Sequence, residues 1–125
     1  MGNVLDCGCR RRRSHQSKVP VPLSTSAIYL LDFIALVEEY PCLYANQKVL
    51  VEAVRRYEKV WLPLLASVNP KERIQLVPPL DVEWVWHCHL LSPKDYRRDI
   101  AKVLNVDAEG EFMIDHRLVS KKQRE

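Results

Sequence analysis

A chain of 125 residues that is 47% hydrophobic and 28% charged has the balance of one soluble globular domain, which excludes a fibrous or wholly disordered protein. No apolar run reaches the roughly 18 residues needed to span a membrane, and the N-terminus lacks the apolar core of a secretory signal, so we expect a cytoplasmic protein. Residues 19–116 carry ten Lys or Arg against fourteen Asp or Glu, so the body lacks the clustered positive charge that nucleic-acid binding requires.

Residues 1–24 are predicted to form a basic, disordered leader. Within it, residues 1–18 carry five Lys or Arg and one Asp. Four of these basic residues are consecutive: Arg10, Arg11, Arg12 and Arg13. This basic patch has three interpretations, namely attraction to the anionic inner leaflet of a membrane, contact with RNA, and a solvated or nuclear-import run.

Three residues of the leader are candidates for lipidation. Gly2, which follows the initiator Met, is a myristoylation candidate, and Cys7 and Cys9 are palmitoylation candidates. Two acyl chains, or one chain together with the arginine run, would hold the protein at the inner face of the plasma membrane. Asp6 counts against this interpretation, because the acylation pattern prefers Ser or Thr at that position.

Residues 25–105 are predicted to form an all-α domain, a compact array of about four helices, followed by a loop and a C-terminal helical tail over residues 106–125. The first helix should start near Ser26, after a proline-bearing connector, and stop at Pro41. Its stretch AIYLLDFIALVEEY places apolar residues on nearly every side, which predicts packing on more than one face.

The second helix should be capped by Asn46 and is the clearest amphipathic helix of the chain. Its apolar residues recur at helical spacing: Leu50, Val54, Tyr57 and Trp61. Glu52 stands four residues before Arg56, the favourable order for an ion pair on a helix surface. Pro63 is expected to bend or end the helix, and residues 69–73 are expected to form a loop or a short helical turn.

Two further helices are predicted after the double proline that precedes Leu80. Asp81 is the expected N-cap of a third helix over residues 82–91. Ser92 as a cap and Pro93 at the first helical position then indicate the start of a fourth helix, which should end near residue 104.

His87 and His89 stand two residues apart on the predicted third helix, so their rings point about 160° apart and cannot bind one metal ion together. His87 shares its face with Glu83, which leaves three interpretations: a surface ion pair, a hydrogen bond, or two ligands of a metal site. The candidates for completing such a site are Asp115 and His116, or Asp99.

His89 falls beside Val85 and Trp86, where we expect a buried neutral imidazole bonded to the backbone or to a carboxyl group. Both histidines are therefore expected to be structural, with neither a metal nor a cofactor. Cys88 is predicted to be a core thiol, and Trp84 and Trp86 are predicted to be core aromatics.

The fourth helix is expected to expose a basic edge formed by Tyr96, Arg97 and Arg98. With only three glycines in the chain there is no glycine-rich phosphate loop, and no nucleophile elbow is present. The sequence therefore predicts no catalytic residue.

Two segments carry a more specific pattern: AVRRYEKVWLPLL, residues 53–65, and LVPPLDVEWVWHCHLLSPKDYRRDI, residues 76–100. In order and separation they resemble the N-terminal module of the glycine-rich domain-containing proteins, best known from plants. The resemblance spans residues 30–104. The motif residues that carry it are Trp61, Asp81, Trp84, Trp86, His87, His89 and Tyr96.

The resemblance implies a module of unknown function with no established catalytic activity. Some plant members add an RNA-recognition module and a long glycine-rich tail, and this chain resembles a short form whose missing helices would leave apolar surface for another chain. Our principal hypothesis is a non-enzymatic helical interaction or adaptor module for a protein partner, tethered to a membrane through its N-terminus. The alternatives are a metal-binding regulator or metal-dependent enzyme that uses His87 and Glu83, and an RNA-associated adaptor that uses the arginine run.

Overall fold

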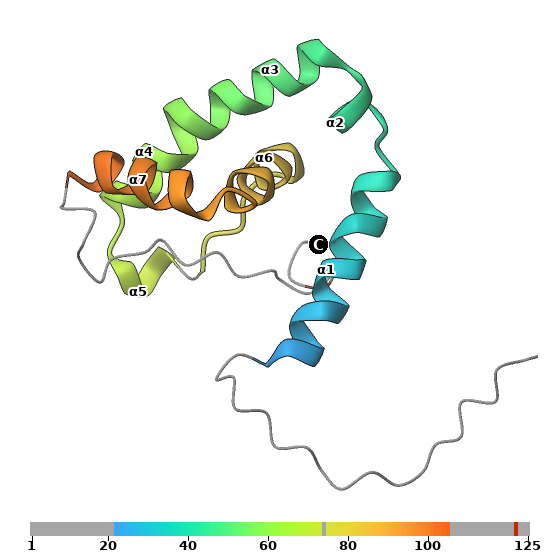
Figure 1. Cartoon of the computed structure of the whole chain (residues 1–125), viewed down its shortest axis with the longest axis horizontal. Coiled ribbons are helices and arrows are strands. Elements are labelled where there is room, and N and C mark those ends of the chain that lie inside the picture. The colour runs from blue at the N-terminus through green and yellow to red at the C-terminus, as the bar shows by residue number, and fades with distance from the viewer. Residues whose placement is uncertain (1–21, 74, 106–121, 123–125) are drawn as a thin grey trace, which may run out of the picture.

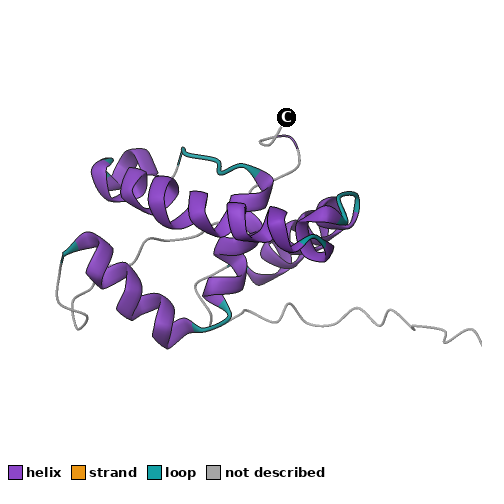
Figure 2. Ribbon diagram, turned by 90° about the horizontal axis from the view of Figure 1, so that it is seen from above, coloured by secondary structure: helices purple, strands orange, loops and turns teal. Residues whose placement is uncertain are grey.

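A computed structural model describes residues 22–73, 75–105 and 122, and these contain helices and loops without a strand (Figure 2). The all-α prediction is confirmed. The elements are α1 (Leu23–Glu38), α2 (Cys42–Ala45), α3 (Gln47–Arg56), the π-helical turn η1 (Tyr57–Trp61), α4 (Leu62–Ser67), α5 (Pro70–Arg73), α6 (Leu80–Leu90) and α7 (Pro93–Leu104). Four of them, α1, α3, α6 and α7, have seven or more residues, which agrees with the predicted array of about four helices.

Helix α1 starts at Leu23, ahead of the predicted Ser26 and inside the predicted leader, because Pro22 supplies the first carbonyl: the Ser26 N–H donates to it at 3.0 Å. Packing on more than one face is not observed. Of the residues of α1 only Phe33 and Val37 are buried, whereas Ile28 and Leu31 are more than half exposed. Figure 1 shows the reason, since α1 stands at the edge of the described structure and meets it along one side.

Helices α3 and α4 and the turn η1 form one continuous rod (Figure 1). Asn46 caps α3 as predicted, with its side-chain oxygen accepting from the backbone N–H groups of Lys48 at 3.0 Å and Val49 at 3.4 Å. The rod passes through Pro63 without ending, because the Leu62 N–H donates five residues back to the Tyr57 carbonyl. This wider π turn makes room for a proline ring that would clash with the carbonyl four residues earlier in an α-helix.

The buried face of α3 differs from the predicted one by one residue. Ala53 is 2% exposed, whereas Val54 is 39% exposed. The predicted ion pair between Glu52 and Arg56 is replaced by two others. Glu52 binds Arg55, whose Nε lies 2.9 Å from Oε2 of Glu52. Arg56 pairs with Asp81 at the start of α6. A long-range partner across the helix interface therefore replaces the predicted local one.

Helix α6 lies at the centre of the described structure, between α1 on one side and the α3 rod and α7 on the other (Figure 1). It contributes to both hydrophobic clusters. The larger cluster consists of Tyr57, Trp61, Leu62, Leu65, Val82, Trp86, Tyr96 and Ile100. The smaller consists of Phe33, Val37 and Leu43, with Leu80 and Trp84 packed against it. Helix α6 is apolar on two faces because it packs against neighbouring helices on two sides.

Helix α7 starts at Pro93 and ends at Leu104, as predicted, and Asn105 closes it in the left-handed conformation with φ of 53°. Asn tolerates this conformation better than most residues. The predicted exposure of Tyr96 is wrong, because that side chain is 1% exposed and belongs to the larger cluster. None of the described helices combines the length and the apolar character that crossing a membrane would take.

Candidate functional site

The two histidines of α6 lie on opposite sides of the helix, in agreement with the angle predicted from helical geometry. The His87 ring packs on Phe33 of α1, with 5.5 Å between the ring centroids. The His89 ring faces the other way, toward Tyr57 of η1 and Tyr96 of α7, at centroid distances of 5.8 and 4.9 Å. The two imidazoles therefore belong to different surroundings and cannot share a ligand.

His89 joins three elements by side-chain hydrogen bonds. Its Nδ1 lies 2.8 Å from the Tyr57 hydroxyl of η1, and its Nε2 lies 3.3 Å from Oδ2 of Asp99 on α7. A bond to a carboxyl group was one of the two partners expected for this ring, although the side chain is 19% exposed rather than fully buried. Asp99, a candidate for completing a site around His87, instead binds His89. We call Tyr57, His89 and Asp99 the hydroxyl–imidazole–carboxylate chain.

The protonation states in this chain follow from its surroundings. Burial, followed by the charges of Tyr96, Asp99 and Glu58, raises the pKa of Tyr57, so the phenol keeps its proton. Partial burial opposes ionisation of Asp99, but the hydrogen bonds and charges of Arg98 and His89 hold its pKa below the ordinary value. A carboxylate only accepts, so Nε2 donates to Asp99, and a neutral imidazole with its proton on Nε2 accepts at Nδ1 from the Tyr57 hydroxyl.

The geometry limits what the hydroxyl–imidazole–carboxylate chain can do chemically. Tyr57 is 3% exposed, so its hydroxyl is out of reach of a substrate. An activated nucleophile or general base must lie within hydrogen-bond reach of the group that it attacks or deprotonates. The hydrogen bonds of His89 tie η1, α6 and α7 together.

The core prediction is confirmed for Trp86 and only in part for Trp84. Trp86 is 4% exposed, and its Nε1 donates to the hydroxyl of Tyr96 at 3.0 Å. Trp61 packs edge-on against Trp86, with centroids 5.7 Å apart. Trp84 is half-buried and faces the other cluster, 6.3 Å from Phe33. These rings are packed against protein on both sides of α6, which is the setting of core aromatics rather than of an open stacking platform.

The Glu83 carboxyl is buried, at 1% exposure, so of the three interpretations left open for Glu83 and His87 the surface ion pair is wrong. Among the residues that the structure describes, no group of three or more His, Cys, Asp or Glu is placed to hold a metal ion. Two of the candidates for completing such a site, Asp115 and His116, lie outside the described residues. The metal hypothesis therefore gains no support from the described part of the chain.

Cys88 is exposed, so the predicted core thiol is wrong. Cys88 lies on the part of the α6 surface between the two sides that pack against other helices. The sequence alone could not show which part of the helix surface is left exposed to solvent. Partial burial still raises the pKa of the Cys88 thiol, which keeps it protonated and weakly nucleophilic at neutral pH.

Asp81 does not cap α6, which begins one residue earlier, at Leu80, with Pro79 in the N-cap position. Its carboxylate pairs with Arg56 of α3 instead. The Asp81 side chain is 13% exposed and that of Arg56 is 42% exposed, so the pair lies at the border between the core and the surface. This contact connects the start of α6 to the end of α3.

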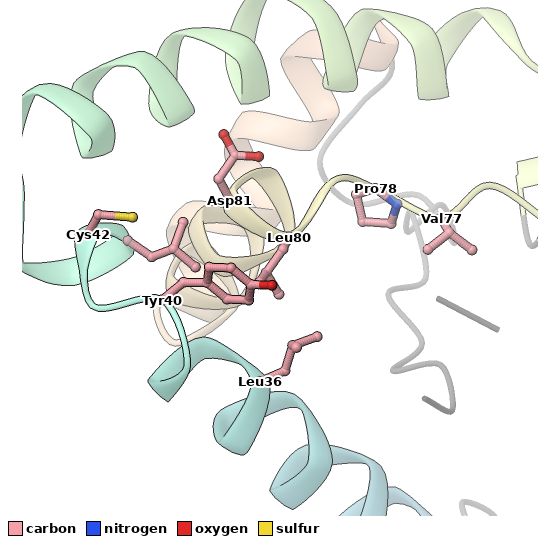
Figure 3. A pocket seen from close by; sticks show the side chains of 8 residues that line it. Leu36, Tyr40, Cys42, Val77, Pro78, Leu80 and Asp81 are labelled. Carbon is pink, nitrogen blue, oxygen red and sulfur yellow. The ribbon is translucent and has the colours of Figure 1, made fainter. Parts of the chain in front are cut away.

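Next to Asp81 a pocket of about 420 Å³ opens between the end of α1 and the start of α6 (Figure 3). One wall comes from the segment around the α1–α2 turn: Leu36, Tyr40, Cys42 and Leu43. The facing wall comes from the connector before α6 and from its first turn: Val77, Pro78, Leu80 and Asp81. Six of these eight side chains are aliphatic or aromatic, which makes an apolar hollow with one carboxylate and one thiol.

Sequence reasoning missed this pocket. Its only local signal is the double proline, which holds the residues before α6 extended and away from the α1–α2 turn. The two walls are about 40 residues apart in sequence, so only the tertiary fold brings them together. Tyr40 and Val77 remain 50% and 39% exposed at its edge.

The lipidation candidates Gly2, Cys7 and Cys9 lie outside the described residues. The same holds for the basic patch of Arg10, Arg11, Arg12 and Arg13. Predictions on the leader and on the tail after residue 105 are therefore untested by the structure.

Comparison with known proteins supports the resemblance seen in the sequence. The family model described as "Glycine-rich domain-containing protein-like" matches residues 12–99. Glycine-rich domain-containing protein 2 of Arabidopsis thaliana is 44% identical over 84 residues, and Glycine-rich domain-containing protein 1 of the same plant is 39% identical over 85 residues. These segments cover 65% and 66% of the chain but 10% of each relative, so the chain spans about a tenth of their length. No solved structure matches the chain.

Proposed function

We propose that this chain, which belongs to the glycine-rich domain-containing protein-like family, is a non-enzymatic helical adaptor module that binds a protein partner in the pocket between α1 and α6. The observation that carries this proposal is the pocket itself. Its volume of about 420 Å³ falls within the roughly 300–1,000 Å³ typical of binding pockets, and its lining is mostly apolar.

The edge of the pocket has the character of a protein-binding surface. Tyr40 is half exposed, and an aromatic ring with a polar end is a frequent anchor in interfaces. Val77, on the facing wall, is 39% exposed, so apolar side chains lie open on both sides of the pocket.

The groups best suited to catalysis are engaged elsewhere. His89 is held between Tyr57 and Asp99, and none of these three residues lines the pocket. The pocket has one carboxylate, that of Asp81, which is already paired with Arg56. This arrangement favours binding over bond-breaking chemistry.

A site-directed photo-crosslinker tests the proposal. Benzoylphenylalanine in place of Tyr40, in the full chain expressed in eukaryotic cells, is expected to capture a defined protein that mass spectrometry identifies. The matched control carries the same crosslinker in place of Val60, which is 55% exposed on η1. Val77→Asp in the Tyr40 crosslinking chain places a charge in the apolar wall and should abolish the capture. The proposal fails if the identified protein crosslinks equally from position 60, or equally with Val77→Asp.

We further propose that the leader tethers this module to the inner face of the plasma membrane in the cytoplasm. The sequence pattern supports it, since Gly2, two nearby cysteines and four arginines together supply the two signals that stable anchoring takes. Mass spectrometry of the N-terminal peptide from eukaryotic cells should show an acyl chain on Gly2, and Gly2→Ala should move the protein to the soluble fraction. An unmodified Gly2 would end the idea. RNA binding that weakens with salt and is lost on replacing the arginines would favour the RNA alternative.

A further inference from the structure

We infer that the partner of this pocket is a basic peptide segment, in which an apolar side chain enters the pocket and a neighbouring Lys or Arg lies over Glu39. This inference rests on the proposed function and specifies the chemistry of the partner. It follows from the charges of the elements that build the pocket, from the polarity of α1, and from the size of the hollow.

The segments that line the pocket contain acidic residues but no Lys or Arg. Residues 22–46, which contain α1 and α2, include three acidic residues and no Lys or Arg. Residues 75–92, which contain the connector and α6, include two acidic residues and no Lys or Arg. The Lys and Arg residues of the described body therefore lie on the other elements. Because Glu83 is buried and Asp81 is paired with Arg56, the exposed negative charge of these segments comes from Asp32, Glu38 and Glu39.

The charge is strongest at the end of α1. Glu38 and Glu39 are exposed and directly precede Tyr40, which lines the pocket. They also stand at the C-terminal end of a helix, where the peptide dipoles leave a partial negative charge. Basic residues usually offset that charge, but the last turn of α1 has none. At 100° per residue Glu39 lies about 60° from Leu36, which lines the pocket, whereas Glu38 points to the far side of the helix. The Glu39 carboxylate and a negative helix pole therefore lie together beside the pocket.

At the start of α6, by comparison, the negative side chains are offset by positive charge. Its N-terminal pole is positive, and Asp81 and Glu83 stand in its first turn. Asp81, the carboxylate inside the pocket, is in addition paired with Arg56. The attraction for a cation is thus weaker at the wall formed by α6 than at the end of α1. This difference gives the partner an orientation, with its basic residue toward α1.

The hollow sets the size of the apolar group. A volume of about 420 Å³ lies near the lower end of the range for binding pockets, which suits one or two large side chains rather than a whole element. Leu36 and Leu80 face each other across it (Figure 3), so an aliphatic or aromatic side chain would be held between them.

A peptide selection tests the inference. A phage-displayed library of random 12-residue peptides is the probe, and the immobilised full chain is the target. Enriched peptides are expected to combine a large apolar residue with Lys or Arg within a few positions. Fluorescence anisotropy on the enriched peptides should show that Glu39→Lys weakens binding about threefold or more, since an attractive charge becomes repulsive. Glu58→Lys, an equal charge reversal at an exposed position of η1, is the matched control and should have little effect.

The outcomes separate this inference from the proposed function. Enriched peptides that need Val77 but carry no basic residue, or whose binding is unchanged by Glu39→Lys, overturn the basic partner and leave the pocket as a binding site. Peptides that bind Val77→Asp as well as the natural chain overturn both. A selection that succeeds only when Arg10–Arg13 are all replaced by Ser would make the chain's own leader the occupant, and the inference of a separate partner would be wrong.

Discussion

The hydroxyl of Tyr57 lies 2.8 Å from Nδ1 of His89, and this contact joins two residues that are 32 positions apart in the chain. His89 in turn reaches Asp99, so one imidazole connects the π-helical turn, the central helix and α7. A turn of π-helix shifts the side chains that follow it relative to an α-helix. Tyr57 opens that turn, which makes the turn part of how the fold holds its central histidine.

Removing the Tyr57 hydroxyl should destabilise the fold. Tyr57→Phe keeps the ring but leaves Nδ1 of a partly buried His89 without its hydrogen-bond partner, so we expect the free energy of unfolding to fall by about 1–2 kcal/mol. Urea denaturation followed by circular dichroism measures the change. Tyr44→Phe, at a ring that is 48% exposed, is the control and should stay within about 0.5 kcal/mol. Equal effects of the two substitutions would contradict a role for the hydrogen bond.

Stability should also decline in acid, through Asp99. The pKa of Asp99 in the folded protein lies below its ordinary value of 3.8, so the unfolded chain takes up the proton first as the pH falls. The stabilisation is therefore present above pH 3.8 and disappears as the pH drops through the folded value. Asp99→Asn should flatten this part of the stability curve. Denaturant midpoints between pH 2.5 and 6 would show it, and an unchanged slope in Asp99→Asn would refute the assignment.

At high pH, stability should fall as the pH rises, because of Tyr57. Its pKa in the folded protein is raised above the ordinary value of 10.0, because burial and nearby negative groups disfavour the phenolate. Above pH 10 the unfolded chain loses the Tyr57 proton while the folded chain keeps it, so stability falls as the pH rises. Tyr57→Phe, although less stable at neutral pH, should lose less stability between pH 9 and 11 than the natural chain. Parallel curves for the two proteins would count against this explanation.

The Arg56–Asp81 pair should couple more strongly than the Glu52–Arg55 pair. Its members connect α3 to α6 and are partly buried, whereas both side chains of the second pair are more than half exposed on one helix. Double-mutant cycles with Ala replacements are expected to give about 1 kcal/mol or more for the first pair and about 0.3–0.5 kcal/mol for the second. Coupling that is equal in the two cycles would show that the inter-helix contact adds nothing beyond a surface pair.

The amino-acid sequence by itself determined which segments are helical and where several of these helices begin and end. Asn46 and Pro93 start helices where local chemistry predicts, and the double proline and Ser92 bracket α6. Once that segment is helical, the divergence of its two histidines follows from 100° per residue alone. These features depend on interactions within a few residues, which a single sequence displays in full.

Only the tertiary structure decided which side chains contact each other across different helices. Asp81 could serve equally as a cap or as the partner of a distant arginine, and the position of Arg56 across the helix interface settled the choice. Neighbouring elements likewise decided that Ala53 rather than Val54 is buried and that Cys88 stays exposed. The pocket between α1 and α6 arises in the same way, because its walls meet only after the chain has folded. Periodicity fixes the direction in which a side chain points, but not which segment lies there to receive it.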